Sequence, residues 1–421
     1  MEHKLKKNNF LPGLFVGIVS SVLVYLLVFS VFDLKPNKTE GSVIASTSDS
    51  SKDTETVSAM TTDIMNKISV LESIIDTYYL GDVDENAMVD GIYKGLLESL
   101  DDPYSCYYTA EEYQQLMESS NGIYCGIGAT VTQNVNTKVI TIVKPFVNGP
   151  AYNAGLLPND IVYKVDGEDV TNNDLSEVVS RMKGEEGTEV KVTVIREGKA
   201  EPIELVIKRG KIEVPTIEYK MLENKIGYIS VAEFDKVTAS QYRSAIEALE
   251  KQGMKALVVD VRNNPGGRLE TVVDMLDRML PKGLIVYQED KNGIRDEEES
   301  TNKEKFTKPL AVLINGNSAS ASEIFAGAIQ DYKIGTIVGT TSFGKGIVQS
   351  IIPLNDGTAV KVTVSKYFTP NGRNIHGTGI TPDIEVDLDS EVANQVVIDY
   401  EDDAQLQKAV EVLKDQMKKS K

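Results

Sequence analysis

Near the N-terminus, residues 10–32 form a continuous, mostly apolar run without a charged side chain. A helix rises about 1.5 Å per residue, so this run can span the roughly 30 Å hydrocarbon core of a bilayer. Lys4, Lys6 and Lys7 precede it, and the positive-inside rule keeps residues 1–9 in the cytoplasm. We expect a single-pass anchor. A cleaved signal peptide is the alternative, but the run is longer than usual for one and no A-x-A-like site follows closely.

The next two segments differ from the anchor and from each other. Residues 33–60 are rich in Ser, Thr, Lys and acidic residues, a composition typical of a flexible tether. Within residues 61–119, apolar side chains recur at helical spacing, and "DDPYS" at 101–105 interrupts them. This predicts a small helical region with a turn, whose expected role is packing or self-association.

Residues 120–210 carry short runs of alternating apolar and polar positions, among them "KVITIVKPF" and "EVKVTVIREG". Such runs predict β-strands. The spacing in 174–182 predicts one helix. We therefore expect a compact, mostly-β module.

In residues 211–386 short apolar runs alternate with amphipathic helical patterns. Strands are expected at 225–231, 255–261, 284–287 and 310–314, and helices at 240–251, 269–280 and 322–332. This alternation is typical of α/β layers. The acidic stretch 288–305 predicts a solvated insertion.

The last segment, residues 387–421, is expected to be helical. Within it, residues 401–414 place Leu406, Ala409, Val410 and Leu413 on one helical face. That face has two explanations, a homodimer contact and packing onto the protein's own core, and the sequence does not decide between them.

Charge and cysteine content exclude several classes of protein. The formal net charge of -19 would repel a phosphate backbone, so nucleic acid is not an expected partner. The two cysteines, Cys106 and Cys125, are too few for a disulfide framework and are not clustered as metal ligands. We expect free thiols and no metal site.

The segment "GNSASASEI", residues 316–324, follows the apolar strand 310–314 and begins a predicted helix. Ser320 and Glu323 have the S-x-x-E spacing of a capping box, which alone would explain them. The end of a buried strand and the start of a helix is also where α/β sheets bind ligands. There the backbone amide of Ala321 could donate to an oxyanion, and a second donor could come from Gly266 or Gly267 in "RNNPGG".

A serine nucleophile also needs a base. Outside the cytoplasmic segment the sole histidine is His376, in a Gly-rich segment that predicts a surface turn. The alternative is Lys345, between two glycines and before the apolar strand 347–354. Desolvation would lower its pKa from about 10.4 toward neutrality.

Four motifs in order, "VVDVRNNPGG", "SASASEIFAGAIQDY", "SFGKGIVQ" and "YFTPNGRNIHGTGITPDIEV", resemble those of the carboxyl-terminal processing (tail-specific) proteases. The resemblance runs from about residue 64 to the C-terminus. It implies an α/β protease core with crotonase-like or Clp-protease-like layers and an inserted PDZ domain. It also implies a Ser–Lys dyad in which Ser320 is the nucleophile, Lys345 the general base and Gln349 the residue that orients the lysine. Asp331, an acid discussed for the family, is expected to be structural.

Within the β module, "YCGIGA" resembles the carboxylate-binding loop of PDZ domains, which holds a peptide C-terminus through successive backbone amides. Its residues are Tyr124, Cys125, Gly126, Ile127, Gly128 and Ala129. The later segment "GPAYNAGLLPNDIVYKVDGEDV" is also PDZ-like, and Ile127 is expected to line the apolar pocket beside the loop.

Together these expectations describe a membrane-anchored serine endopeptidase on the extracytoplasmic side of a bacterial cell membrane. It would bind the unstructured C-terminal tails of proteins and cleave near them without a metal or organic cofactor. A homodimer and an activating partner are further expectations. The rivals are a catalytically silent PDZ scaffold and a crotonase-like enzyme acting on acyl thioesters. The intact set of Ser320, Lys345 and Gln349 argues against the scaffold.

Overall fold

The computed structural model describes residues 52–301, 306–393 and 398–419. The expected membrane anchor at 10–32 lies outside these residues, and within them no helix is both long and apolar enough to cross a bilayer. The chain forms two units, Met1–Val83 and Asp84–Lys421, which are described separately.

The first unit contains one long helix, α2 (Lys52–Tyr78). It begins inside the segment expected to be a flexible tether. Several of its described apolar side chains are exposed: Ile64, Leu71 and Ile74 are each about half exposed, at 49%, 52% and 49%.

The second unit starts with α3 (Glu85–Glu98), the short strand β1 (Cys106–Tyr108) and α4 (Ala110–Asn121). Thr109 and Glu112 form a capping box that begins α4, and Gly122, in the left-handed conformation at φ 64°, ends it. β1 lies in a region for which the sequence predicted only helices and a turn. Three residues are too few for a periodic signal, and the strand exists through its antiparallel pairing with β18 (Ala359–Phe368).

The mostly-β module was expected from its alternating runs. Its antiparallel sheet has the order β3-β4-β5-β7-β8, and β6 pairs with β5. Val190, Val192 and Val194 alternate inward along β7 and are fully buried. The strands β2 and β9 pair with each other beside this sheet. The elements are β2 (Ile123–Gly126), β3 (Ala129–Gln133), β4 (Ile140–Pro145), α5 (Pro150–Asn153), β5 (Ile161–Val165), β6 (Glu168–Asp169), α6 (Leu175–Met182), β7 (Glu189–Ile195), β8 (Ile203–Lys208) and β9 (Gly210–Glu213).

The α/β core is built on a six-stranded sheet of order β10-β11-β12-β15-β16-β19. All its pairings are parallel except that of β10 with β11. Every residue of β12 and β15 is buried, as expected for parallel strands covered on both faces. Its elements are β10 (Ile217–Leu222), η1 (Glu223–Lys225), β11 (Ile226–Val231), α7 (Thr238–Lys251), β12 (Ala256–Asp260), α8 (Leu269–Asp277), β15 (Leu310–Ile314), α9 (Ala321–Asp331), β16 (Thr336–Gly339), β19 (Ile384–Glu385) and α10 (Ser390–Ala393).

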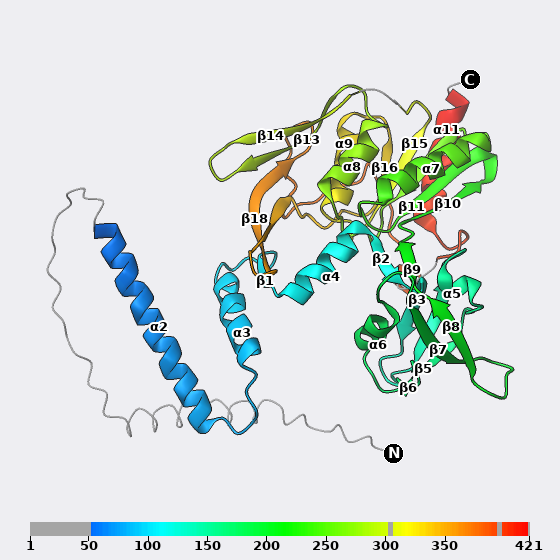
Figure 1. Cartoon of the computed structure of the whole chain (residues 1–421). Helices are drawn as coiled ribbons and strands as arrows, with labels where there is room; N and C mark the ends of the chain where they lie inside the picture. Colours follow the sequence, from blue (N-terminus) through cyan, green and yellow to red (C-terminus); the bar gives the residue numbers. More distant parts are fainter. Residues whose placement is uncertain (1–51, 302–305, 394–397, 420–421) are drawn as a thin grey trace, which may run out of the picture. The chain divides into compact units, whose positions relative to one another are not determined.

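Helices cover both faces of this sheet (Figure 1). One apolar cluster joins one face to side chains of α7, α8 and α9. On the other face α11 (Ala404–Lys419) packs through Leu406, Ala409, Val410 and Leu413, all buried. The apolar stripe near the C-terminus therefore covers the protein's own core, which decides between the two explanations left open by the sequence.

A second, antiparallel sheet has the order β1-β18-β13-β14, and β17 (Ile347–Pro353) also pairs with β18. β13 (Gly283–Asp290) and β14 (Arg295–Ser300) form a hairpin. The described part of the acidic stretch expected to be a solvated insertion thus contains the end of β13 and all of β14. Its side chains are mostly exposed, and the backbone pairing of the hairpin is what makes it regular structure. Cys106 and Cys125 are both free thiols.

Candidate active site

Ser320 lies between β15 and α9 in a strained backbone conformation. Its φ of 54° and ψ of -113° are rarely adopted by a residue with a Cβ, and strain of this kind tends to occur at functional sites. Two contacts hold it there. The Tyr367 hydroxyl donates to the Ser320 carbonyl oxygen at 3.1 Å, and Gly266 lies so close that a Cβ built on it would be 2.8 Å from the Ser320 Cβ.

Glu323, in the first turn of α9, joins the serine loop to the loop that carries Lys345. Its buried carboxylate accepts from the Ser320 amide at 2.8 Å and from the Lys345 amide at 2.9 Å. It also accepts from the Gly344 amide at 2.7 Å and the Ser342 hydroxyl at 2.6 Å. Of the capping box expected from the sequence, the bond from the Ser320 amide to Glu323 is formed, while the Glu323 amide donates to the Ser320 carbonyl oxygen at 2.8 Å. The acid fixes two loops at once.

Lys345 lies in the loop between β16 and β17 and is half-buried. Its amine sits over the Tyr104 ring, with Nζ 4.5 Å from the ring centroid. Burial lowers the pKa of Lys345 below its ordinary value, and the charge of Lys361 lowers it further, whereas Asp102 and Glu323 raise it. The net effect is a pKa below the ordinary value, which lowers the cost of forming the neutral amine, the form that can accept a proton.

In the described part of the chain, no hydrogen bond joins the Ser320 hydroxyl to the Lys345 amine. Gln349 is close to the lysine loop, on β17, but its Nε2 donates to Thr363 Oγ1 at 3.2 Å. These two residues are opposite each other in the β17–β18 ladder, next to a bulge between Val348 and Gln349, and bulges re-aim side chains near functional sites.

Of the amides expected to form the oxyanion hole, those of Ala321 and Gly267 have no acceptor among the described residues. The Gly266 amide is already used, because it donates to Asn264 Oδ1 at 2.9 Å. Gly267 has a φ of 138°, and a Cβ there would be 2.5 Å from the Phe234 carbonyl oxygen, so the position requires glycine.

Asp331 and His376, two further polar residues considered from the sequence, have no contact with Ser320 or Lys345 among the hydrogen bonds of the described residues. Asp331 accepts from the Arg373 guanidinium and from the Asn371 amide, which anchors the loop after β18. His376 is exposed; its backbone amide donates to Asn374 Oδ1 at 3.1 Å, and no hydrogen bond of its ring is present in the described chain.

Sequence reasoning missed the part that residues 101–105 play. They supply the Tyr104 ring beneath Lys345 and Asp102, which accepts from the Thr363 hydroxyl at 2.7 Å. "DDPYS" gave a turn signal, and the partner strand β18 is more than 200 positions away in the chain. Single-sequence patterns carry no information on such a pairing.

The candidate peptide-binding loop is shorter than the six residues named for it. Tyr124, Cys125 and Gly126 belong to β2 and pair with β9, and Ala129 begins β3. Only Ile127 and Gly128 lie between the strands, and their amides donate to no acceptor in the described residues. Burial raises the pKa of Tyr124 to about 12.

A groove of about 310 Å³ lies next to this loop. Ile127, Ala129 and Val131 line one side, and Val179 and Met182 of α6 line another. Residues from outside the β module also line the groove: Gln115, Glu118 and Ser119 of α4, and Val214, Glu233 and Asp235. Asp235 is 5% exposed, and burial, with the neighbouring charge of Glu233, raises its pKa to about 7 despite the opposing charge of Arg268.

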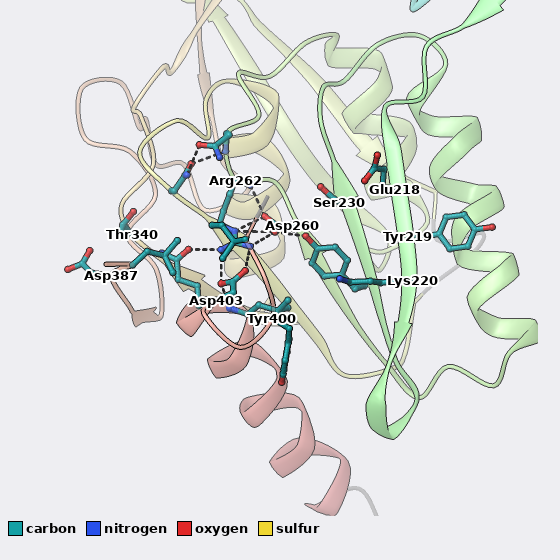
Figure 2. A pocket seen from close by; sticks show the side chains of 17 residues that line it. Glu218, Tyr219, Lys220, Ser230, Asp260, Arg262, Thr340, Asp387, Tyr400 and Asp403 are labelled. Carbon is teal, nitrogen blue, oxygen red and sulfur yellow. Dashed lines mark hydrogen bonds and ion pairs between the residues drawn. The ribbon is translucent and has the colours of Figure 1, made fainter. Parts of the chain in front are cut away.

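Figure 2 shows a second hollow, of about 500 Å³, at the carboxyl ends of the parallel strands. Its centre is the Arg262 guanidinium, paired with Asp260 at 2.6 Å and with Asp403, just before α11, at 2.8 Å. Arg262 also donates to Gln405. These bonds tie α11 to the loop that continues into Gly266 and Gly267.

Three protein-family models match the chain. The model described as "Peptidase family S41" matches residues 225–386, "PDZ domain" matches residues 125–207, and "Activating protease CtpB N-terminal domain" matches residues 22–112. The first match contains the serine and lysine loops, and the second contains the part of the groove that the β module lines.

The chain is also similar to curated relatives. Carboxy-terminal processing protease CtpA of Bacillus subtilis is 38% identical over 327 residues, 77% of this chain and 69% of that protein. The carboxy-terminal-processing protease of Bartonella bacilliformis is 38% identical over 319 residues, 74% and 73% of the two chains. A solved structure titled photosystem II D1 C-terminal processing protease is 29% identical, covers 76% of this chain and 86% of its own, and gives a TM-score of 0.45. The chain therefore belongs to peptidase family S41, among the carboxy-terminal processing proteases, and is a serine-type endopeptidase.

Proposed function

We propose that this endopeptidase is anchored in the cell membrane, binds protein C-termini in its PDZ groove, and cleaves peptide bonds with Ser320 as nucleophile and Lys345 as base. The observation that carries the catalytic part is the Glu323 carboxylate, which holds the backbones of both residues within hydrogen-bond distance of the same group. Burial lowers the pKa of Lys345, which suits it to the role of base.

The reaction begins with a movement of the Lys345 side chain. Its amine leaves the Tyr104 ring and reaches the Ser320 hydroxyl, because the bond between them is not formed in this structure. The neutral amine takes the hydroxyl proton while Oγ attacks the substrate carbonyl carbon. The amides of Gly267 and Ala321 donate to the oxyanion that develops, aided by the positive end of the α9 dipole.

Collapse of the tetrahedral intermediate releases the amine of the leaving peptide, which receives its proton from the Lys345 ammonium. A water molecule, deprotonated by the same lysine, then hydrolyses the acyl-enzyme. Gln349 supplies no proton, since its side chain is an amide, and its role is to fix geometry.

The PDZ part of the proposal rests on an open strand edge and free amides. β3 is an edge strand of its sheet, so an extended peptide can add to it. The amides of Ile127 and Gly128 would hold the peptide carboxylate, and the groove beside Ile127 would take the last apolar side chain. Glu233 and Asp235 also line this groove, which supports coupling between peptide binding and the core.

Membrane anchoring, the extracytoplasmic location and a homodimer complete the proposal. The uncharged run at 10–32 supports the anchor. Exposed apolar side chains on α3, such as Ile92 at 41% and Leu96 at 68%, support self-association. Alkaline carbonate extraction of membranes tests the anchor, and light scattering of wild type and Leu96→Lys tests the dimer.

The deciding experiment compares full-length protein with Ser320→Ala and Lys345→Ala on unfolded casein near pH 8. Loss of cleavage in both variants, with unchanged circular dichroism, supports the Ser–Lys mechanism, and retained cleavage in either one contradicts it. A peptide ending in an apolar residue should stimulate wild type, whereas the same peptide with an amidated C-terminus should not. Equal stimulation by both would contradict carboxylate recognition.

A further inference from the structure

The turn of residues 101–105 contacts the candidate base directly. Tyr104 presents its ring face to the Lys345 amine at 4.5 Å. An ammonium group over an aromatic face is stabilised by the quadrupole of the ring. Tyr104 therefore favours the charged, resting position of Lys345, away from Ser320.

The same turn also reaches Gln349, on the strand that follows the lysine loop, through a chain of hydrogen bonds. Gln349 Nε2 donates to Thr363 Oγ1 at 3.2 Å, and that hydroxyl donates to Asp102 Oδ2 at 2.7 Å. Ser105 adds two bonds, because its hydroxyl donates to Asp102 and accepts from the Thr363 amide at 3.1 Å. The Gln349 side chain is thus fixed by a carboxylate from a segment almost 250 residues earlier in the chain.

Asp102 is suited to this role as an anion. Burial disfavours its charged form, but the hydrogen bonds from Ser105, Thr363 and the Tyr104 amide, together with the Lys345 charge, outweigh burial and lower its pKa. An anionic acceptor makes each of these bonds stronger than a neutral one would.

We propose that the 101–105 turn is a positioning unit of the active site, in which Tyr104 holds the resting Lys345 amine and Asp102 fixes Gln349 through Thr363. This inference rests on the proposed Ser–Lys mechanism. It adds residues from outside the peptidase core to the catalytic apparatus, so displacement of the turn would change catalysis without touching the serine loop.

Three charged groups act on the Lys345 amine and determine how each variant shifts its titration. Asp102 on the turn and Glu323 on α9 raise its pKa, and Lys361 on β18 lowers it. Lys361 is itself held by a 2.7 Å bond to the Tyr108 hydroxyl. Removal of Asp102 or Lys361 should therefore move the titration in opposite directions.

The test is the rate at which a fluorophosphonate probe labels Ser320 in full-length protein, measured from pH 5 to 10. In this reaction the serine oxygen bonds to phosphorus, fluoride leaves, and the base takes the hydroxyl proton. The rate thus reports the fraction of neutral Lys345 without a peptide substrate. The acid midpoint should fall by roughly half to one pH unit in Asp102→Asn and rise by a similar amount in Lys361→Met.

Thr363→Val tests the positioning of Gln349 separately from the charge of Asp102. It breaks the chain to Gln349 and leaves the charge of Asp102 in place, so the plateau rate should fall about tenfold with an unchanged midpoint. Tyr104→Leu should lower the midpoint, and Tyr104→Phe, which retains the ring face, should behave as wild type.

The inference is overturned if Asp102→Asn and Thr363→Val both keep plateau rates within twofold of wild type and unshifted midpoints. Ser320→Ala and Lys345→Ala separate this outcome from failure of the proposed function. If those two abolish casein cleavage while the turn variants are normal, only the positioning role is lost. If they retain cleavage, the mechanism itself is wrong.

Discussion

Replacing Glu323 by glutamine tests whether one carboxylate holds the two candidate catalytic loops. The carboxylate is 0% exposed and accepts from four donors, two on each oxygen. A glutamine amide has a single acceptor oxygen. Whichever way it is placed, its NH₂ group must face two donors.

The magnitude follows from the cost of unsatisfied groups. Each stranded buried donor costs about 1–3 kcal/mol. Two donors are left without an acceptor. If the structure relaxes partly around one of them, the expected loss in the free energy of unfolding is about 3 kcal/mol. Because both loops also lose their fixed spacing, turnover should fall by roughly a hundredfold or more.

The assay is urea unfolding followed by circular dichroism, with casein cleavage measured on the same samples. Glu112→Gln is the matched control, because Glu112 occupies the same capping-box position on α4 with 43% of its side chain exposed. It should cost less than about 1 kcal/mol. Equal effects of the two substitutions, or Glu323→Gln with near-normal stability and activity, would refute the reasoning.

Three other substitutions address separate features. Ser320→Gly should be more stable than Ser320→Ala by about 1 kcal/mol in urea unfolding, because glycine adopts the positive φ of that position without strain; equal stabilities would argue against strain. Arg262→Met should lower the unfolding free energy by about 3–5 kcal/mol, since it leaves Asp260 and Asp403 buried without their partner; a change below 1 kcal/mol would contradict this. The pKa of Asp235 is raised to about 7, so its protonated form is favoured in the folded state, and the stability it contributes is lost as pH rises between about 4 and 7. Asp235→Asn should remove that decline, about 4 kcal/mol at about 1.4 kcal/mol per pKa unit, and parallel pH profiles of the variant and wild type would refute it.

The alternating strands and helices of the core could be predicted because each is long enough to show its period. The strand at 310–314 and the helix after it, with the serines between them, follow from buried apolar runs and a capping signal alone. α6 likewise begins and ends close to the predicted positions. The family resemblance then assigned roles that no spacing could assign.

The features that could not be predicted from the sequence depend on contacts between distant segments. β1 is a strand because β18 pairs with it, and Tyr104 lies under Lys345 because of that pairing. The engagement of the Gly266 amide by Asn264 distinguishes it from Gly267, although the two glycines are equivalent in the motif. Which backbone amide is already hydrogen-bonded can be seen only in the structure.

The Glu323 carboxylate also limits how this enzyme can be switched off. Because the same group binds the backbones at Ser320 and Lys345, the two loops cannot be drawn apart without breaking its three bonds to Ser342, Gly344 and Lys345. An inactive state that keeps the fold must instead differ in side-chain rotamers, such as that of the lysine. Inhibitors that select the resting enzyme would then recognise the orientation of one flexible side chain against a fixed backbone, and would need no larger rearrangement to bind.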